Sequence, residues 1–307
     1  MRLALVAGFL AVATASISCG TSTRSLVIGN VTREFEVYRP SSTCQSSGGS
    51  ADAFMPGIGA PPATTQSPAT AVVLCLHGWR QTGSWACMAM CAPHADAHGY
   101  IAVCPSGTVD GVNSLTGWNT DEASAWSSVD DVGFFRAAVA DVHARANVVQ
   151  NTTYAIGFSM GGGMIYRLMC EASDLFSGFS VVAQYGPWAP NAGIGSAHGA
   201  SWVGNCTPAA PRPFWASVGT SDRFFDATNA RLGWEGMSRT AKGCSGEPEV
   251  TLNVSTTTPH VNPGPVTCRR FTNCTGGEPS EFCSYDQLLH VYPSTAGYNA
   301  GAATTWR

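Results

Sequence analysis

Five short runs of consecutive apolar residues are the feature that most restricts the fold of this 307-residue chain. Continuous apolar runs of this length are typical of strands buried on both faces of a parallel sheet. Helix-like segments separate them, and this alternation predicts an α/β fold class with one doubly wound, mostly parallel sheet. The runs are AVVLCL (71–76), YIAVCP (100–105), TYAIGF (153–158), FSVVAQYG (179–186) and FWASVG (214–219).

The clearest helix signal lies in the segment 130–146, DDVGFFRAAVADVHARA. Its apolar residues recur at helical spacing, so they would line one face. Asp130 or Asp131 is placed to act as the N-cap. The residues of the apolar face are Val132, Phe135, Val139 and Val142.

Before the first apolar run, the segment RSLVIGNVTREFEVYRP (24–40) reads as two strands joined at Gly29-Asn30, ending at Pro40. We expect an antiparallel N-terminal hairpin at the edge of the sheet. From 41 to 70 the composition changes to Ser, Gly, Pro and Ala without apolar periodicity, which predicts a flexible loop outside the core.

The N-terminus has the pattern of a secretory signal peptide, which we place at residues 1–18. One arginine precedes an apolar run from Leu3 to Ala13, and small residues follow. That run is too short to span a bilayer comfortably, and no later stretch approaches the roughly 20 apolar residues of a membrane helix. A lipid anchor at Cys19 is an alternative, although the sequence SISC lacks the large aliphatic residue that such a site prefers.

Twelve cysteines indicate an oxidising compartment, with disulfides whose pairing the sequence does not define. Only 12% of residues are charged, and the net charge of -4 includes no basic block that would neutralise a phosphate backbone. We therefore expect an extracellular monomer that binds neither nucleic acid nor membrane. Five N-glycosylation sequons begin at Asn30, Asn151, Asn205, Asn253 and Asn273.

The segment TYAIGFSMGGGMIYRL (153–168) raises the possibility of a nucleophile at Ser159, which lies between Gly157 and Gly161. In a Gly-x-Ser-x-Gly elbow the serine sits on a sharp strand-to-helix turn, and small neighbours let the strand and the helix approach closely. A plausible strand precedes Ser159 and a plausible helix follows it. This context favours a nucleophile over a merely flexible connection.

A serine nucleophile needs a histidine base and an acid, which follow it in chain order on such a fold. Asp222 lies just beyond the run 214–219, at the sheet edge where Ser159 would emerge, and Asp226 is the reserve candidate. Among the later histidines we favour His290, which follows the short apolar segment YDQLL, as the base. The other histidines after Ser159 are His198 and His260.

An oxyanion would need backbone N–H donors. Met160, which follows the serine, supplies one, and the Trp79 amide in LCLHGWRQ is the second, because Gly78 allows a sharp turn there. We expect His77 to brace this loop. Trp118 and Trp188 follow strand-like or turn segments and are candidate substrate contacts by stacking.

The segment CMAMCAPHADAH has the spacing of a zinc site. In an oxidising compartment its cysteines would pair with other cysteines, and all four candidate ligands also fall on one helical stripe. We therefore expect no metal and no other cofactor. The four candidates are Cys87, Cys91, His94 and His98.

Several motifs together resemble a secreted esterase family of the α/β-hydrolase superfamily, which contains polyhydroxybutyrate depolymerases and feruloyl or acetylxylan esterases. The motifs are LHGWRQT, HGYIAVCPSG, VDDVGF, GFSMGGGM and LLHVYP, in this order. The likeness runs from about Leu26 to the C-terminus and is weaker between Lys242 and Tyr285; the approach YDQLLH also lacks the glycines usual in the family. It implies Ser159 as nucleophile, Asp222 as acid, His290 as base, and the Trp79 and Met160 amides as the oxyanion hole.

The resemblance implies a catalytic domain over residues 19–307 that cleaves carboxylic esters through an acyl-enzyme. Its expected substrate is a feruloyl or acetyl ester on plant cell-wall polysaccharide. Polyester depolymerisation is the nearest alternative. The sequence also allows a catalytically inactive protein that binds polysaccharide through aromatic loops, or a secreted serine peptidase.

Overall fold

In a computed structural model of the chain, a ten-stranded sheet runs in the order β1-β2-β4-β3-β7-β8-β9-β12-β11-β10. The structure describes residues 16–44, 69, 71–111, 113–189, 200–253 and 265–292. Its strands are β1 (Gly20–Ile28), β2 (Val31–Arg39), β3 (Val72–Leu76), β4 (Ile101–Pro105), β7 (Thr153–Phe158), β8 (Gly178–Val182), β9 (Phe214–Gly219), β10 (Glu249–Asn253), β11 (Val266–Phe271) and β12 (Ser280–Tyr285). A separate two-stranded sheet joins β5 (Thr108–Val109) and β6 (Thr116–Gly117).

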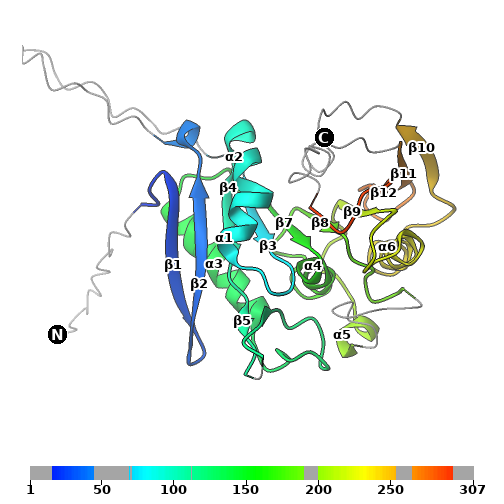
Figure 1. Cartoon of the computed structure of the whole chain (residues 1–307). Coiled ribbons are helices and arrows are strands. Elements are labelled where there is room, and N and C mark those ends of the chain that lie inside the picture. Colours follow the sequence, from blue (N-terminus) through cyan, green and yellow to red (C-terminus); the bar gives the residue numbers. More distant parts are fainter. Residues whose placement is uncertain are drawn as a thin grey trace, which may run out of the picture.

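The centre of the sheet is parallel and both edges are antiparallel. Strands β4, β3, β7, β8, β9 and β12 pair in parallel, whereas β1, β2, β11 and β10 pair antiparallel with their neighbours. Figure 1 shows the hairpin β1–β2 and the strand β10 at opposite edges. The predicted fold class, the N-terminal hairpin and all five predicted buried strands are confirmed.

Helices cover both faces of the sheet. The helical segments are η1 (Ser41–Thr43), α1 (Gly83–Ala86), the π-helical η2 (Cys87–Cys91), α2 (Ala92–His98), α3 (Asp131–Arg145), α4 (Met160–Glu171), α5 (Ser201–Gly204) and α6 (Ala227–Lys242). Helices α3, α4 and α6 pack in one apolar core, and α1, η2 and α2 pack in the other. Strand β3 is apolar throughout because both of its faces are buried. Leu74 and Leu76 lie in the first core, and Val73 and Cys75 lie in the second.

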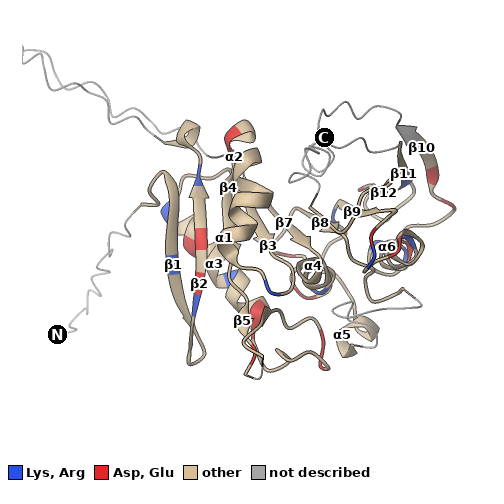
Figure 2. Cartoon of the chain, viewed as in Figure 1, with Lys and Arg blue, Asp and Glu red and all other residues tan. Residues whose placement is uncertain are grey.

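Hydrogen bonds distinguish the roles of Asp130 and Asp131 at the start of α3. Asp130, and not Asp131, is the N-cap of α3, because its Oδ1 accepts from the Gly133 N–H at 2.8 Å. Asp131 is instead buried in an ion pair with Arg33 of β2 at 2.7 Å, which fastens the hairpin to α3. Figure 2 shows acidic and basic residues interspersed along β2.

The run predicted at 179–186 is a shorter strand, and five strands were not predicted, namely β5, β6, β10, β11 and β12. Strand β8 ends at Val182 because Ala183 has a φ of 54°, which is incompatible with extended backbone. Strands β10, β11 and β12 fall in the region where the family likeness is weaker, and β12 (SEFCSY) lacks the continuous apolar run of the predicted strands.

All twelve cysteines are paired. Cys87 and Cys91 bond to Cys104 and Cys75, so the zinc-like spacing supplies two disulfides that staple η2 to β3 and β4. Cys19 bonds to Cys44, which engages the sulfur that a lipid anchor would need. The remaining disulfides are Cys170–Cys206, Cys244–Cys274 and Cys268–Cys283.

The N-glycosylation sequons lie at the surface wherever their side chains are described. No helix within the described ranges is long and apolar enough to cross a membrane. Asn30, Asn151, Asn205 and Asn273 are exposed, and the Asn253 side chain lies outside the described residues. Most of the predicted 41–70 loop also lies outside them.

The burial of Ile17 is relevant to where the predicted signal peptide is cleaved. Its side chain is only 3% exposed within the core, and its carbonyl accepts from Arg39 Nη1 at 2.8 Å. Cleavage after Ser18 would remove this residue. Ala13-Thr14-Ala15 has the small-x-small pattern of a signal-peptidase site, so we propose that cleavage follows Ala15.

We expect the mature protein to start at Ser16 and Ile17→Ala to lower its free energy of unfolding by about 2 kcal/mol, the cost of truncating a buried isoleucine. Intact mass and denaturant unfolding of the secreted protein measure both. A mature chain beginning at Cys19 would contradict the proposal.

Candidate active site

Ser159 occupies a sharp turn between β7 and α4. Its φ of 54° and ψ of −121° lie outside the regions that L-residues ordinarily adopt. Its N–H donates to the Val182 carbonyl of β8 at 2.9 Å, which anchors the turn to the neighbouring strand. The side chain therefore projects from the carboxyl edge of the parallel strands.

The glycines beside Ser159 are required by close backbone contacts. A Cβ at Gly157 would lie 2.2 Å from the Gly161 carbonyl oxygen. One at Gly161 would lie 2.4 Å from the Leu76 carbonyl oxygen. Since real Cβ atoms do not approach backbone oxygens so closely, β7, α4 and the end of β3 can meet here only at glycine.

Ser159, His290 and Asp222 form one hydrogen-bonded chain. His290 Nε2 lies 3.1 Å from Ser159 Oγ, and His290 Nδ1 lies 2.8 Å from Asp222 Oδ2. A carboxylate beside Nδ1 favours the tautomer with its proton there, which leaves Nε2 free to accept the serine proton. This arrangement can activate Ser159 as a nucleophile.

The second carboxylate oxygen of Asp222, the one that does not contact His290, accepts two backbone hydrogen bonds. Its side chain is fully buried, and Oδ1 accepts from the backbone N–H groups of Phe224 at 2.8 Å and Phe225 at 3.0 Å. The reserve candidate, Asp226, instead caps α6 by accepting from the Asn229 N–H and contacts the Tyr185 hydroxyl. His198 and His260 lie outside the described residues.

Three phenylalanine rings surround His290, and the sequence analysis did not identify them. The ring centroids of Phe158, Phe224 and Phe225 lie 4.9, 5.0 and 5.4 Å from that of His290. Because these rings offer no hydrogen-bond acceptor in their planes, they leave the ring nitrogens to Ser159 and Asp222. A repeated phenylalanine beside the predicted acid, in DRFFD, was the available sequence signal.

Gln184 is a second contact that the sequence analysis missed. Its Nε2 donates to the Ser159 carbonyl at 3.1 Å, and its Oε1 accepts from the Tyr185 N–H at 2.8 Å. The side chain is 2% exposed. It therefore fixes the peptide that follows the serine.

The loop after β3 lies against Ser159. A Cβ at Gly78 would be 3.0 Å from Ser159 Cβ, and the Gly78 N–H is occupied by Gln81 Oε1 at 2.7 Å. The next amide along, that of Trp79, and the Met160 amide at the start of α4 remain the predicted oxyanion donors. The first amides of a helix have no partner within it and favour negative charge.

His77 braces this loop in the way the sequence suggested. It is fully buried; Nδ1 donates to the Gly78 carbonyl at 2.7 Å and Nε2 accepts from the Gly107 N–H at 2.9 Å. Burial lowers the pKa of His77 to about 4, against the weaker opposing effect of the Gly78 carbonyl. The imidazole is therefore neutral at pH 7.

The two candidate substrate tryptophans lie in different settings. Trp118 is fully buried, donates from Nε1 to the His77 carbonyl at 2.8 Å and stacks on His77, so its prediction as a substrate contact is wrong. Helix α3 covers the loop of Trp118, and the Phe135 ring of that helix lies 5.3 Å from the Trp118 ring. Trp188 is half-buried against α6, where a Cβ at Gly236 would lie 2.3 Å from Trp188 Cβ, and its role stays a prediction.

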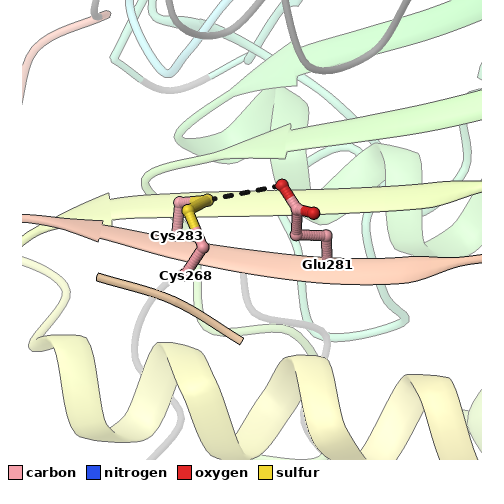
Figure 3. A group of neighbouring side chains, drawn as sticks. All are labelled: Cys268, Glu281 and Cys283. Carbon is pink, nitrogen blue, oxygen red and sulfur yellow. Dashed lines mark hydrogen bonds between the residues drawn. A yellow bond between two sulfur atoms is a disulfide. The ribbon is translucent and has the colours of Figure 1, made fainter. Parts of the chain in front are cut away.

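One group of potential metal ligands occurs among the described residues, away from Ser159. Cys268 and Cys283 face each other across β11 and β12 with Glu281 beside them (Figure 3). The two sulfurs are joined in a disulfide, so neither is a thiolate that could bind zinc.

Comparison with known proteins places this geometry in context. The model of the alpha/beta hydrolase family matches residues 73–291. Feruloyl esterase B of Piromyces equi is 28% identical over 201 residues, which are 60% of this chain and 33% of that protein. The chain spans about a third or less of the length of the curated relatives it matches.

Two solved structures match this chain at low sequence identity. An acetyl xylan esterase from Aspergillus awamori has a TM-score of 0.54 at 14% identity, and the match covers 89% of this chain and 95% of that one. A ferulic acid esterase has a TM-score of 0.49 at 17% identity, covering 71% and 84%.

Replacing Ser159 should reverse the usual order of alanine and glycine. We expect Ser159→Gly to be more stable than Ser159→Ala by about 1 kcal/mol, because glycine adopts positive φ without strain. Denaturant unfolding of the two variants measures the difference. Greater stability of the alanine variant would show that the turn is unstrained.

The buried neutral His77 should make stability depend on pH. The pKa of His77 is about 4 in the folded protein and 6.5 in the unfolded chain. The stability that depends on neutral His77 is therefore fully present above pH 6.5 and is lost as the pH falls to 4. We expect a loss of roughly 3 kcal/mol over that window, from the linkage between protonation and folding. Unfolding titrations at several pH values test this, with His77→Gln as the comparison; an equally steep loss in the variant would contradict it.

Proposed function

Because the chain belongs to the alpha/beta hydrolase family, we propose that it is a secreted serine hydrolase of carboxylic esters. The observation that carries the proposal is the hydrogen-bonded chain Ser159–His290–Asp222 at the end of three parallel strands. Six disulfides support secretion, because such bonds persist in oxidising compartments.

In the proposed reaction, His290 Nε2 takes the proton of Ser159 Oγ as the oxygen attacks the ester carbonyl. Asp222 holds Nδ1–H and stabilises the imidazolium that forms. The C–O bond to the alcohol then breaks, and His290 returns the proton to the leaving oxygen. Water, activated by the same imidazole, releases the acid and restores Ser159.

The carbonyl oxygen becomes an oxyanion in each half of this reaction. We assign the stabilisation of this oxyanion to two backbone amides. The Met160 amide follows Ser159 at the start of α4, and the Trp79 amide belongs to the loop after β3, which lies against Ser159. Fixed backbone donors stabilise developing charge without reorganisation when the reaction occurs. The buried, neutral His77 supports the loop of Trp79, because its single N–H donates to the Gly78 carbonyl and its other ring nitrogen accepts from the Gly107 N–H.

For the substrate we propose a feruloyl or acetyl ester on plant cell-wall polysaccharide. The named activities of the similar proteins, feruloyl esterase and acetyl xylan esterase, support this class. No metal or organic cofactor is required by the serine mechanism.

An inactive binding protein is disfavoured by the backbone. Ser159 keeps a conformation that costs of order 1–3 kcal/mol, which a surface that only binds has no physical reason to retain. The intact hydrogen bonds to His290 and Asp222 point the same way.

We expect the secreted protein to hydrolyse methyl ferulate or p-nitrophenyl acetate, and Ser159→Ala to reduce kcat by at least about a thousandfold, as removal of a triad nucleophile does. A soluble hydroxybutyrate oligomer and a peptide serve as the competing substrates. Preference for the oligomer or the peptide would replace the proposed substrate class.

The same assay has an outcome that overturns the whole proposal. If the wild type cleaves none of these compounds, or Ser159→Ala is equally active, the hydrolase proposal fails and a binding role takes its place. Circular dichroism of the alanine variant checks that it is folded.

A further inference from the structure

Phe224 is an exposed aromatic residue beside the triad. Of its side chain and backbone surface, 69% is accessible, more than for Trp79 at 43%. Among the exposed large hydrophobic residues in the described part of the chain, these two are the aromatic ones, and both adjoin the candidate site. Scattered exposed aliphatic residues are ordinary, but an aromatic ring exposed at a catalytic centre is a candidate ligand contact.

The position of Phe224 is fixed by the triad itself. Its N–H donates to Asp222 Oδ1 at 2.8 Å, and its ring centroid lies 5.0 Å from that of His290 with the planes at 60°. The neighbouring Phe225 is 7% exposed and packs against Tyr185 as well as His290. Phe225 thus supports the base from inside, while Phe224 leaves most of its surface to solvent.

The chemistry of the proposed reaction identifies which part of the substrate reaches this ring. His290 Nε2 must deliver its proton to the leaving alcohol oxygen, so that oxygen has to lie within hydrogen-bond distance of the imidazole. In the proposed reaction the carbonyl oxygen is bound by the Trp79 and Met160 amides and not by His290. The alcohol group, bonded to the leaving oxygen, therefore lies beside His290, and Phe224 is the exposed ring among the three phenylalanines that contact this histidine.

We propose that Phe224 is a specificity-determining residue that binds the alcohol portion of the ester, with the apolar face of a sugar ring packed on its phenyl ring. The proposal rests on the proposed function, which supplies a sugar as the alcohol. An aromatic ring is suited to this task, because it presents a flat apolar surface with little loss of conformational freedom. A methanol leaving group is too small to use that surface.

The test compares two esters with the same acyl group, methyl ferulate and a feruloylated arabinose oligosaccharide. We expect Phe224→Ala to lower kcat/KM for the sugar ester about tenfold, mainly through KM, since uniform binding is lost. The loss for methyl ferulate should be less than about threefold, and Phe224→Trp should restore the sugar ester. Val250→Ala, which truncates an exposed apolar residue on the edge strand β10, is the matched control and should alter neither ester.

Each contrary result overturns the proposal in a distinguishable way. Equal losses on both esters would make Phe224 only a support for His290, and no loss on the sugar ester would mean that it contacts no alcohol. Feruloyl and acetyl esters of one sugar give a further comparison. If Phe224→Ala lowers kcat/KM for the feruloyl ester but not for the acetyl ester, the ring contacts the acyl group instead of the alcohol. If the wild type cleaves neither ester, the proposed function fails, and this inference fails with it.

Discussion

The arrangement of the site depends on one backbone turn, at Ser159. A residue with a side chain is held at φ 54° between β7 and α4, and three contacts prevent it from relaxing. The serine N–H is bonded to Val182, its carbonyl is bonded to Gln184, and glycine contacts let the helix press against the end of β3. Since β8 and the residues just after it supply two of these restraints, the register of β7 on β8 directly sets where the hydroxyl oxygen lies.

The partners of Ser159 are positioned by different means, and each suits its chemistry. A charged carboxylate needs hydrogen bonds when it is buried, and Asp222 accepts from two backbone amides and from His290. The imidazole needs two directed bonds and freedom from competing ones, which its phenylalanine neighbours provide. His77, on the loop opposite, is kept neutral by burial, so it can accept from one peptide and donate to another.

The sequence predicts best those features that depend on residues close together in the chain. The five apolar runs are strands because alternate residues meet separate cores, and the glycines around Ser159 are required by close contacts. Chain order on this fold also pointed to Asp222 and His290, which the structure brings to Ser159. The prediction failed for Trp118, because burial of a loop residue depends on α3 packing over it. The disulfide pairing and the rings around His290 likewise come from segments distant in sequence.

The exposure of Phe224 follows from the same constraints that order the base. Asp222 binds the backbone of both Phe224 and Phe225, so the turn that holds the acid also decides that one ring points inward and its neighbour outward. The backbone of Phe224 cannot shift without loss of its N–H bond to Asp222. The site therefore has a built-in apolar surface on the side where an alcohol must leave, and selection among alcohols can change at this side chain without disturbing the bonds that activate Ser159.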